Sequence, residues 1–316
     1  MRIVFMGSSQ DSIPVLEALL AAGAQLAGVY CQPDKPAGRG RAARAPAIKT
    51  FAQDRSIDVY QPTSLRREAA RREMESLEPE VAVVAAYGKI LPRDVLEVPK
   101  HGCVNIHPSL LPRHRGPSPV STAILRGDQV TGTTVMLMDD GMDTGPVLAS
   151  REVPIGHGDT TAGLTPALFR LGGELLVEVL PLWVQGKVTP RPQDGSQATS
   201  TRKLEKADGE ARWELTAGDL HRMVRAYTPW PGLFTRWRGK LLKILEAAPV
   251  QTGVAPAGEP GEPGQVLAMD ASGGAGVVTG CGLLRLERLQ LEGKRPAAAA
   301  EFIRGYPDFQ GSRLPS

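Results

Sequence analysis

Short apolar runs and amphipathic stretches alternate through the first half of the chain. Arg2–Met6, Leu26–Tyr30 and Val81–Ala86 have the length of strands, and the last run is apolar throughout, as expected for a strand covered on both faces. Shorter strand candidates follow at 103–106, 133–138 and 147–149. Because stretches of helical spacing separate the first runs, the pattern predicts a parallel, right-handed α/β sheet.

Two helices are expected between the first strands. Asp11 or Ser12 can cap a helix with Pro14 in its first turn. Thr63 or Ser64 can cap a second, strongly charged helix that runs to residue 77. Both helices are predicted to lie against the sheet.

A long helix at Thr160–Gly186 closes this half, because its leucines fall at helical spacing, although Gly172-Gly173 should weaken its middle. The stretch that follows is rich in Pro, Gln, Ser and Thr and is expected to be a linker. The predicted organisation is a catalytic domain at 1–189, a linker at 190–206 and a second domain at 207–316.

The tail has a different pattern. Thr216 and Asp219 can form a capping box for a helix that ends at residue 226. Short strand candidates with Gly and Pro turns follow at 233–238, 241–246, 264–269, 276–279 and 283–289, and 247–263 is expected to be a loop. The expected fold class is therefore α/β, with a Rossmann-like parallel sheet in the N-terminal domain and a small C-terminal β-barrel of the OB-like kind.

Composition narrows the class of protein. The 316 residues are 41% hydrophobic and 22% charged, which excludes a collagen, a coiled coil and a disordered chain. The net charge of +3 is small, so any nucleic-acid binding must come from local clusters of Lys and Arg. Cys31, Cys103 and Cys281 give no disulfide framework. With no apolar run of membrane-spanning length and an N-terminus that is typical of a strand rather than a signal peptide, we expect a cytoplasmic protein with no membrane contact.

The strongest candidate chemistry lies in CVNIHPSLLP at 103–112. Alternation along a strand puts Asn105 and His107 on one face, and His107 falls where the strand ends. Ligands of open α/β sheets bind at the carboxyl ends of strands, and an amide beside an imidazole can polarise a carbonyl and move a proton. A strand that merely ends in a hydrogen-bonded turn is the alternative interpretation.

A second candidate, MDDGMDTG at 138–145, directly follows a strand. Asp143 could return to face His107, where its carboxylate would orient the ring and raise its basicity. The alternative is a solvated turn. A metal is not expected, because no second nearby His completes a ligand set.

Basic residues form two further groups. Lys35, Arg39, Arg41, Arg44 and Lys49 lie in a Gly/Pro-rich loop after a predicted strand, where they are either solvated or a phosphate-contacting arm. In the tail, basic residues are interspersed with Trp213, Trp230 and Trp237. That mixture suits binding to a nucleic-acid backbone, or the tryptophans are core and the charges solubilise.

Together these residues resemble the folate-dependent formyltransferases. Asn105, His107 and Asp143 match the catalytic trio of that family, Ser109-Leu110-Leu111-Pro112 matches its signature loop, and 86–92 is similar to the loop that holds the pteridine. Gln32–Gly40 is similar to the tRNA-contacting loop of the family members that formylate initiator methionyl-tRNA, and 225–232 and 289–296 are similar to their C-terminal domain.

The resemblance implies an enzyme that moves the formyl group of 10-formyltetrahydrofolate, its cosubstrate, to the α-amino group of initiator methionyl-tRNA for translation initiation, without a metal and as a monomer. The implied folate contacts are Tyr87, Gly88, Ile90, Leu91, Ser109, Leu110, Leu111, Pro112 and Asp139. The implied tRNA contacts are Lys35, Arg39, Arg41, Arg44, Lys203, Lys206, Arg236 and Arg238.

Two rival functions stay open. A formyltransferase that acts on a sugar-nucleotide amine or on a glycinamide ribotide would share the trio but not this tail. A noncatalytic RNA-binding protein on the same fold would have no use for the trio.

Overall fold

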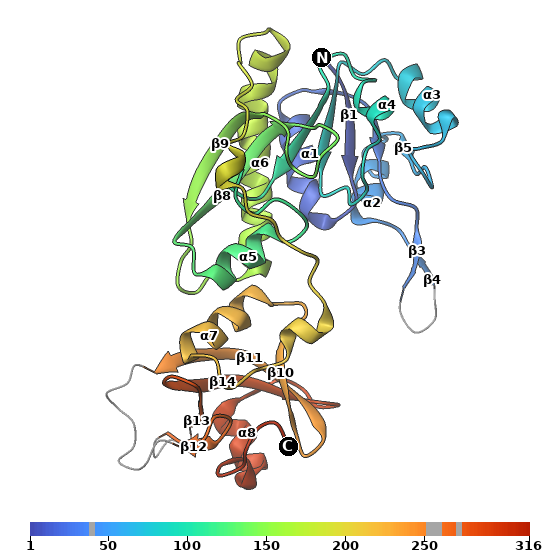
Figure 1. The fold of residues 1–316 in the computed structure, drawn as a ribbon. Coiled ribbons are helices and arrows are strands. Elements are labelled where there is room, and N and C mark those ends of the chain that lie inside the picture. The colour runs from blue at the N-terminus through green and yellow to red at the C-terminus, as the bar shows by residue number, and fades with distance from the viewer. Residues whose placement is uncertain (38–41, 251–260, 270–273) are drawn as a thin grey trace. The chain divides into compact units, whose positions relative to one another are not determined.

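The computed structural model describes residues 1–37, 42–250, 261–269 and 274–316 and divides into two compact units (Figure 1). Unit 1 comprises Met1–Pro119, Gln129–Ile155 and Gly163–Arg202, and unit 2 comprises Val120–Asp128, Gly156–Ala162 and Lys203–Ser316. The domain boundaries at 189 and 206 stay a prediction. No helix in the described part of the chain is long and apolar enough to cross a membrane.

The sheet of unit 1 has the order β5-β2-β1-β6-β7-β8-β9. Its strands are β1 Arg2–Gly7, β2 Gln25–Tyr30, β5 Val59–Tyr60, β6 Val81–Ala85, β7 Cys103–His107, β8 Val130–Leu137 and β9 Val147–Pro154. The first five positions of that order pair in parallel, which confirms the Rossmann-like prediction. β8 and β9 pair antiparallel and so depart from the all-parallel expectation, and the 138–146 loop that joins them is too short for a parallel crossover.

The helices of unit 1 are α1 Ile13–Ala21, α2 Ala47–Gln53, α3 Glu68–Ser76, α4 Arg93–Leu96 and most of α6 Thr161–Val184. A two-stranded hairpin of β3 Lys35–Ala37 and β4 Ala42–Arg44 extends from the sheet (Figure 1).

One predicted helix start and one predicted side-chain cap are wrong. The charged helix begins at Glu68 rather than beside Thr63 or Ser64, because the Ser64 hydroxyl accepts the N–H of Arg66 and closes a turn before the helix. Ser12 stands at the start of α1, but its hydroxyl donates to the Ser9 carbonyl instead of capping the helix.

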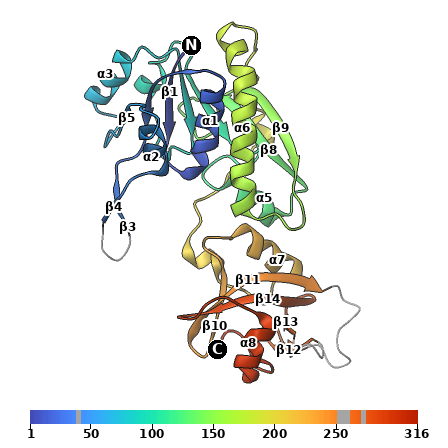
Figure 2. The ribbon, with the colours of Figure 1, turned by 180° about the vertical axis from the view of Figure 1, so that it is seen from behind.

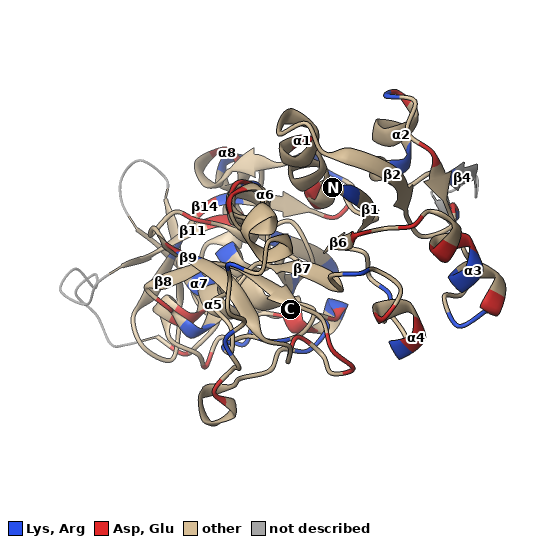
Figure 3. Ribbon diagram, turned by 90° about the horizontal axis from the view of Figure 1, so that it is seen from above, with Lys and Arg blue, Asp and Glu red and all other residues tan. Residues whose placement is uncertain are grey.

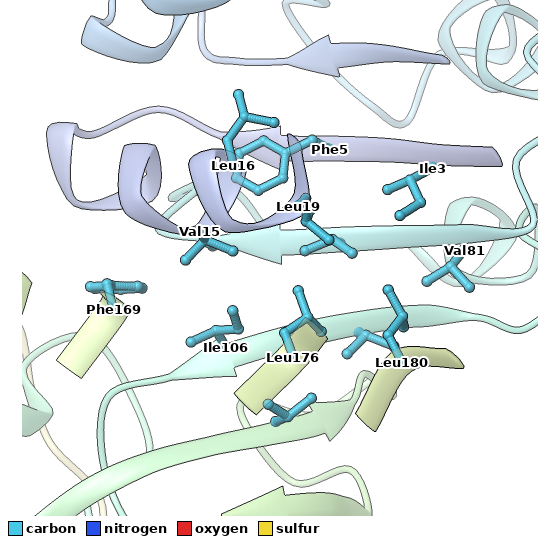
Figure 4. Packing of buried hydrophobic residues seen from close by; sticks show 14 of the residues in the cluster. Ile3, Phe5, Val15, Leu16, Leu19, Val81, Ile106, Phe169, Leu176 and Leu180 are labelled. Atoms are coloured by element: carbon cyan, nitrogen blue, oxygen red, sulfur yellow. The ribbon is translucent and has the colours of Figure 1, made fainter. Parts of the chain in front are cut away.

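Apolar side chains cover both faces of this sheet. On one face, α1 and α6 pack over β1, β6 and β7, with Leu16, Phe5, Ile106 and Leu176 meeting between them (Figure 4). The two helices lie side by side there (Figure 2). On the other face, a second cluster includes Tyr30, Met74, Tyr87, Leu91, Leu96 and Cys103. Burial of the β6 run on both faces explains why it is apolar throughout.

The Gly172-Gly173 pair does not interrupt α6. A Cβ on Gly172 would lie 2.5 Å from Ile106 Cγ2, and one on Gly173 would lie 3.1 Å from the Ala18 Cβ. The two glycines therefore let α6 approach β7 and α1 closely, and that packing outweighs their low helix propensity.

Unit 2 is built on an antiparallel sheet in the order β10-β11-β14-β13-β12, with β15 paired to β14. Its strands are β10 Leu233–Trp237, β11 Lys240–Val250, β12 Val266–Ala268, β13 Ala275–Val278, β14 Leu283–Leu291 and β15 Ala297–Ala298, and its helices are α5 Pro119–Arg126, α7 Ala217–Ala226 and α8 Ala299–Gly305. Among the described strands the path is open between β10 and β12, so the predicted small barrel is a half-barrel.

Several features of unit 2 follow the sequence pattern. The Thr216 hydroxyl accepts the N–H of Asp219 at 3.0 Å, as the capping-box prediction requires. β11 continues to Val250, so the predicted 247–263 loop is wrong at its start, and 251–260 lies outside the described residues. Trp213 and Trp237 are buried core residues, whereas Trp230 is exposed.

Candidate active site

β7 presents Asn105 and His107 on one face of the sheet, because they are two residues apart on the strand. Cys103 shares that face and packs in the cluster that contains Leu91, with Met138 against it. The 86–92 loop and the start of the 138–145 loop therefore lie on the same side of the sheet as the Asn105 amide and the His107 imidazole.

The His107 ring is held at both nitrogens. Its Nε2 lies 2.9 Å from the backbone carbonyl of His114, and its Nδ1 lies 3.6 Å from Asp143 Oδ2, with His107 only 5% exposed. Since a carbonyl can only accept, Nε2 carries a proton, and this partner assigns the tautomer. Nδ1 is therefore the nitrogen that can gain or lose a proton next to the Asp143 carboxylate.

Asp143 reaches His107 because its loop folds back along the sheet. The loop begins beside the start of β7, where the Met138 N–H donates to the Cys103 carbonyl. Asp143 has a left-handed backbone with φ of 56°, and its carboxylate accepts the N–H of Gly116 at 2.7 Å. Asp is among the few residues that adopt this conformation readily.

A segment far along the chain, residues 191–201, is hydrogen-bonded to the loops of this site. Arg191 exchanges backbone hydrogen bonds with Val147 at the start of β9. The Arg115 N–H donates to the Thr199 carbonyl, and the Thr201 N–H donates to the Arg115 carbonyl. The loop after His107 is thus bound to residues 199–201, within the predicted 190–206 linker, and composition gave no sign of this contact.

Gln193 lies in the middle of this segment and connects both catalytic loops. Its Nε2 donates to the carbonyls of Asp143 at 2.9 Å and Gly145 at 2.7 Å. Its Oε1 accepts from Arg115 Nε at 3.0 Å and Nη2 at 2.8 Å. Nothing in the local sequence distinguishes this glutamine from its neighbours, so pattern reasoning had no signal for it.

Ser109 stabilises the signature loop itself. Its hydroxyl donates to the Arg113 carbonyl at 2.7 Å, and its own carbonyl accepts the Thr134 hydroxyl at 2.7 Å. Ser109 is fully buried, whereas Leu110, Leu111 and Pro112 are half-buried. The following three residues, rather than Ser109, have partly exposed side chains.

The 86–92 loop is held mainly by hydrogen bonds to its backbone, and two of its larger side chains, Tyr87 and Leu91, are buried. The Tyr87 ring is buried in the core, and its carbonyl accepts from the Ser8 hydroxyl and from Gln32 Nε2. Gly88 has φ of 75°, and a Cβ there would lie 2.6 Å from Gln32 Nε2. Leu91 is buried and Ile90 is 75% exposed, so Ile90 is the apolar side chain that this loop offers to a ligand.

Asp139 shapes its own loop. Its Oδ1 accepts the N–H of Gly141 at 3.0 Å and the Thr144 hydroxyl at 2.6 Å. These contacts hold the turn that carries Asp143. In the part of the chain that the structure describes, no group of three or more His, Cys, Asp or Glu is arranged to hold a metal ion.

The base of the predicted basic arm lies next to the 86–92 loop. Lys35 Nζ donates to Gln32 Oε1 at 2.6 Å, and Arg44 is exposed and faces Lys35 across the β3-β4 hairpin. Burial, and then the neighbouring Lys35 ammonium, lower the pKa of Lys89. Arg39 and Arg41 lie outside the described residues.

The basic residues predicted in the tail belong to unit 2 and differ in their surroundings. Lys203, Lys206 and Arg236 are exposed. Arg238 forms an ion pair with Asp308, and its guanidinium lies over the Trp237 ring at 4.7 Å.

Comparisons with known proteins identify the family of this chain. The family model described as "Formyl transferase" matches residues 1–180, and the one described as "Formyl transferase, C-terminal domain" matches residues 203–307. The chain therefore belongs to the formyl transferase family and matches both of these family models.

Its relatives specify the branch of that family. A protein of Roseiflexus sp. (strain RS-1) named methionyl-tRNA formyltransferase is 48% identical over 315 residues, which are 99% of this chain and 95% of that protein. A protein of Chloroflexus aggregans with the same name is 47% identical over 305 residues, 96% of this chain and 97% of that protein.

Solved structures share the fold at low identity. The N-formyltransferase from Helicobacter canadensis, in complex with folinic acid and dTDP-3-aminofucose, matches with a TM-score of 0.62 at 17% identity, covering 90% of this chain and 97% of its own. HypX from Aquifex aeolicus in complex with tetrahydrofolic acid matches with a TM-score of 0.64 at 19% identity, covering 96% of this chain but only 47% of HypX.

Proposed function

We propose that this protein transfers the formyl group of 10-formyltetrahydrofolate to the α-amino group of initiator methionyl-tRNA. The observation that carries the proposal is the approach of His107 Nδ1 to Asp143 Oδ2, 3.6 Å apart, on the face of β7 that bears Asn105. The names of the relatives that match nearly the whole chain supply the acceptor, methionyl-tRNA, and the formyl group. The tetrahydrofolic acid bound to HypX supports a folate as the donor. We further propose that the protein acts in the cytoplasm as a monomer.

Asn105 and His107 serve as donors to the formyl oxygen as negative charge develops on it. Because His107 Nε2 is committed to the His114 carbonyl, the donor is the protonated Nδ1. The Asp143 carboxylate beside it stabilises the charged ring. Donors fixed before the reaction need no reorganisation when the charge appears, which makes them effective.

The amine of the acceptor is the nucleophile. Free α-amino groups have a pKa of about 8, so a useful fraction is neutral at physiological pH and no metal or covalent enzyme intermediate is needed. As the new N–C bond forms and the bond to N10 breaks, one proton must leave the amine and one must reach N10. Asp143 is the base on this face, and it carries that proton.

The folate cosubstrate supplies the formyl carbon, and the chain offers a fitting site for its ring. Exposed Ile90 and half-buried Leu110, Leu111 and Pro112 provide apolar contact. Backbone groups of 86–92 and 139–145 provide hydrogen bonds of the kind that bind a pteridine edge. The remaining predicted folate residues support the site by holding these loops in place. They are Tyr87, Gly88, Leu91, Ser109 and Asp139.

The tRNA contacts proposed are phosphate contacts of the basic arm and of unit 2. Lys35 and Arg44 lie at the arm's base, and Lys203, Lys206 and Arg236 are exposed in unit 2. Such contacts position a nucleic acid and weaken as salt rises.

Incubation with 10-formyltetrahydrofolate and charged or uncharged initiator tRNA tests the function. We expect formyl transfer to the charged tRNA alone. Formylation of a sugar-nucleotide amine instead would overturn the acceptor assignment, and tRNA binding with no transfer would support a noncatalytic role.

Substitution tests the roles of the three side chains. Asn105→Ala and His107→Ala should each lower kcat by about 10²- to 10³-fold, as expected for the loss of an oxyanion donor. Asp143→Asn should lower kcat by about 10²- to 10⁴-fold, as expected for the loss of a general base. The KM for tRNA should change little, because none of the three lies among the proposed phosphate contacts. A rise in KM with kcat retained would show that the roles are wrongly assigned.

A further inference from the structure

The Gln193 side chain uses all of its hydrogen-bonding capacity between two loops. Its two N–H donors meet the carbonyls of Asp143 and Gly145, and its oxygen accepts two N–H groups of the Arg115 guanidinium. The side chain is half-buried, so these bonds are partly shielded from water. Only an amide of this length can donate to two carbonyls and accept from one guanidinium at once.

The two carbonyls that Gln193 binds lie at the bend, one on Asp143 itself and one on Gly145 two residues later. A left-handed backbone at this position costs energy and persists only when its surroundings hold it. Gln193 fixes the backbone of this bend, while the Gly116 N–H fixes the carboxylate. Arg115 precedes Gly116, so Gln193 secures the donor and the acceptor of that carboxylate bond together.

We infer that Gln193 is a positioning residue for formyl transfer, which holds the Asp143 carboxylate beside His107 Nδ1 through the Arg115 and Asp143–Gly145 loops. This inference rests on the proposed function. It assigns a catalytic duty to the segment between the long helix and unit 2, where composition alone indicates a linker.

Two near-isosteric variants and a matched control test the inference. Gln193→Met removes every donor and acceptor, and Gln193→Glu keeps the Arg115 contact but turns oxygens toward the two carbonyls. Gln197 lies four residues away in the same segment, is exposed, and its side-chain amide donates to the neighbouring Asp194 carboxylate, so Gln197→Met is the control. Thermal unfolding checks that all variants fold.

With formyltetrahydrofolate and methionyl-tRNA, both Gln193 variants should lose kcat by up to about 100-fold with both KM values nearly unchanged, because misplacement of a catalytic group by about 1 Å has that effect. Gln197→Met should match wild type. In an Asp143→Asn background, Gln193→Met should cause no further loss. Additive losses in that background, or a rise in KM at constant kcat, would overturn the inference.

Hydrogen exchange separates this inference from the proposed function. The Gly116 amide, which Asp143 holds, should exchange faster in Gln193→Met than in Gln197→Met, whatever the substrate. Equal exchange rates of the Gly116 amide in the two variants would refute the clamp, that is, the positioning of Asp143 by Gln193. An inactive wild-type enzyme with faster exchange in Gln193→Met would refute the proposed function and leave the clamp supported.

Discussion

At the scale of single residues, Asp143 meets two requirements at one position, one for its carboxylate and one for its backbone. Its carboxylate faces His107 and accepts from Gly116, and its backbone lies in the left-handed region. Asp and Asn satisfy the second requirement, but only Asp brings a charge. The chemistry and the turn therefore select the same residue for different reasons.

Comparison of Asp143→Asn with Asp143→Ala separates the two requirements. Both variants should lose formyl transfer. Asp143→Ala should also lose about 1–2 kcal/mol of stability, because alanine pays the left-handed penalty that asparagine largely avoids. Urea unfolding measures the difference. Equal unfolding midpoints for the two variants would show that the bend does not depend on this side chain.

At the scale of elements, the approach of α6 to β7 determines where the catalytic face lies. Gly172 meets Ile106, the residue directly before His107, from the opposite side of the sheet. Ile106 is β-branched and stiff, so it can yield little to an added atom. The face of β7 opposite Asn105 and His107 is therefore packed too tightly against α6 to accept an added methyl group at Gly172.

Gly172→Ala should consequently destabilise the protein, although alanine is the better helix former. Overpacking costs about 1–3 kcal/mol, against a gain in helix propensity of about 1 kcal/mol. Gly305→Ala at the end of α8, where an added Cβ meets nothing within 4 Å, is the control and should be neutral or stabilising. Urea unfolding compares the two, and a stabilised Gly172→Ala would contradict this account of the packing.

At the scale of the whole molecule, a net charge of +3 gives little general attraction to a polyanion. Many basic side chains are also matched by acidic ones. On α3 the two signs alternate (Figure 3), with Arg71 paired to Glu75 and Arg72 to Glu68. Binding of tRNA should therefore depend on basic side chains that are not engaged by an acidic neighbour. Arg236 and Arg238, two residues apart at the end of β10, allow the two situations to be compared.

Arg236→Ala should raise the KM for tRNA and reduce the salt dependence of log KM by about one unit of slope, as expected for one phosphate contact. Arg238→Ala should leave that slope nearly unchanged, because its guanidinium is engaged by Asp308 and the Trp237 ring. KM measured over a series of salt concentrations distinguishes them. A larger change of slope for Arg238→Ala would reverse the assignment.

Periodicity predicted the α/β class, β1, β2 and β6 and the capped helix α7, because local hydrophobic patterns and caps determine those elements. It missed that β8 and β9 run antiparallel, although the short 138–146 loop between them excludes a parallel crossover. It could not predict that Gly172 serves close packing, because that contact is distant in sequence. The Asp143–His107 approach agrees with the expectation drawn from alternation and loop position. The His114 carbonyl and Gln193 act through contacts that no local pattern marks.

The segment from Arg191 to Thr201, which is hydrogen-bonded to Val147 and Arg115, has a consequence for the design of truncated versions of this chain. The N-terminal family match ends at residue 180, before the backbone bonds to Val147 and to Arg115 have been supplied. An expression fragment trimmed at that point would retain the sheet, the imidazole and the loops of Arg115 and Asp143, and would lose the segment that is hydrogen-bonded to them. The shortest self-sufficient catalytic fragment should accordingly end beyond Thr201.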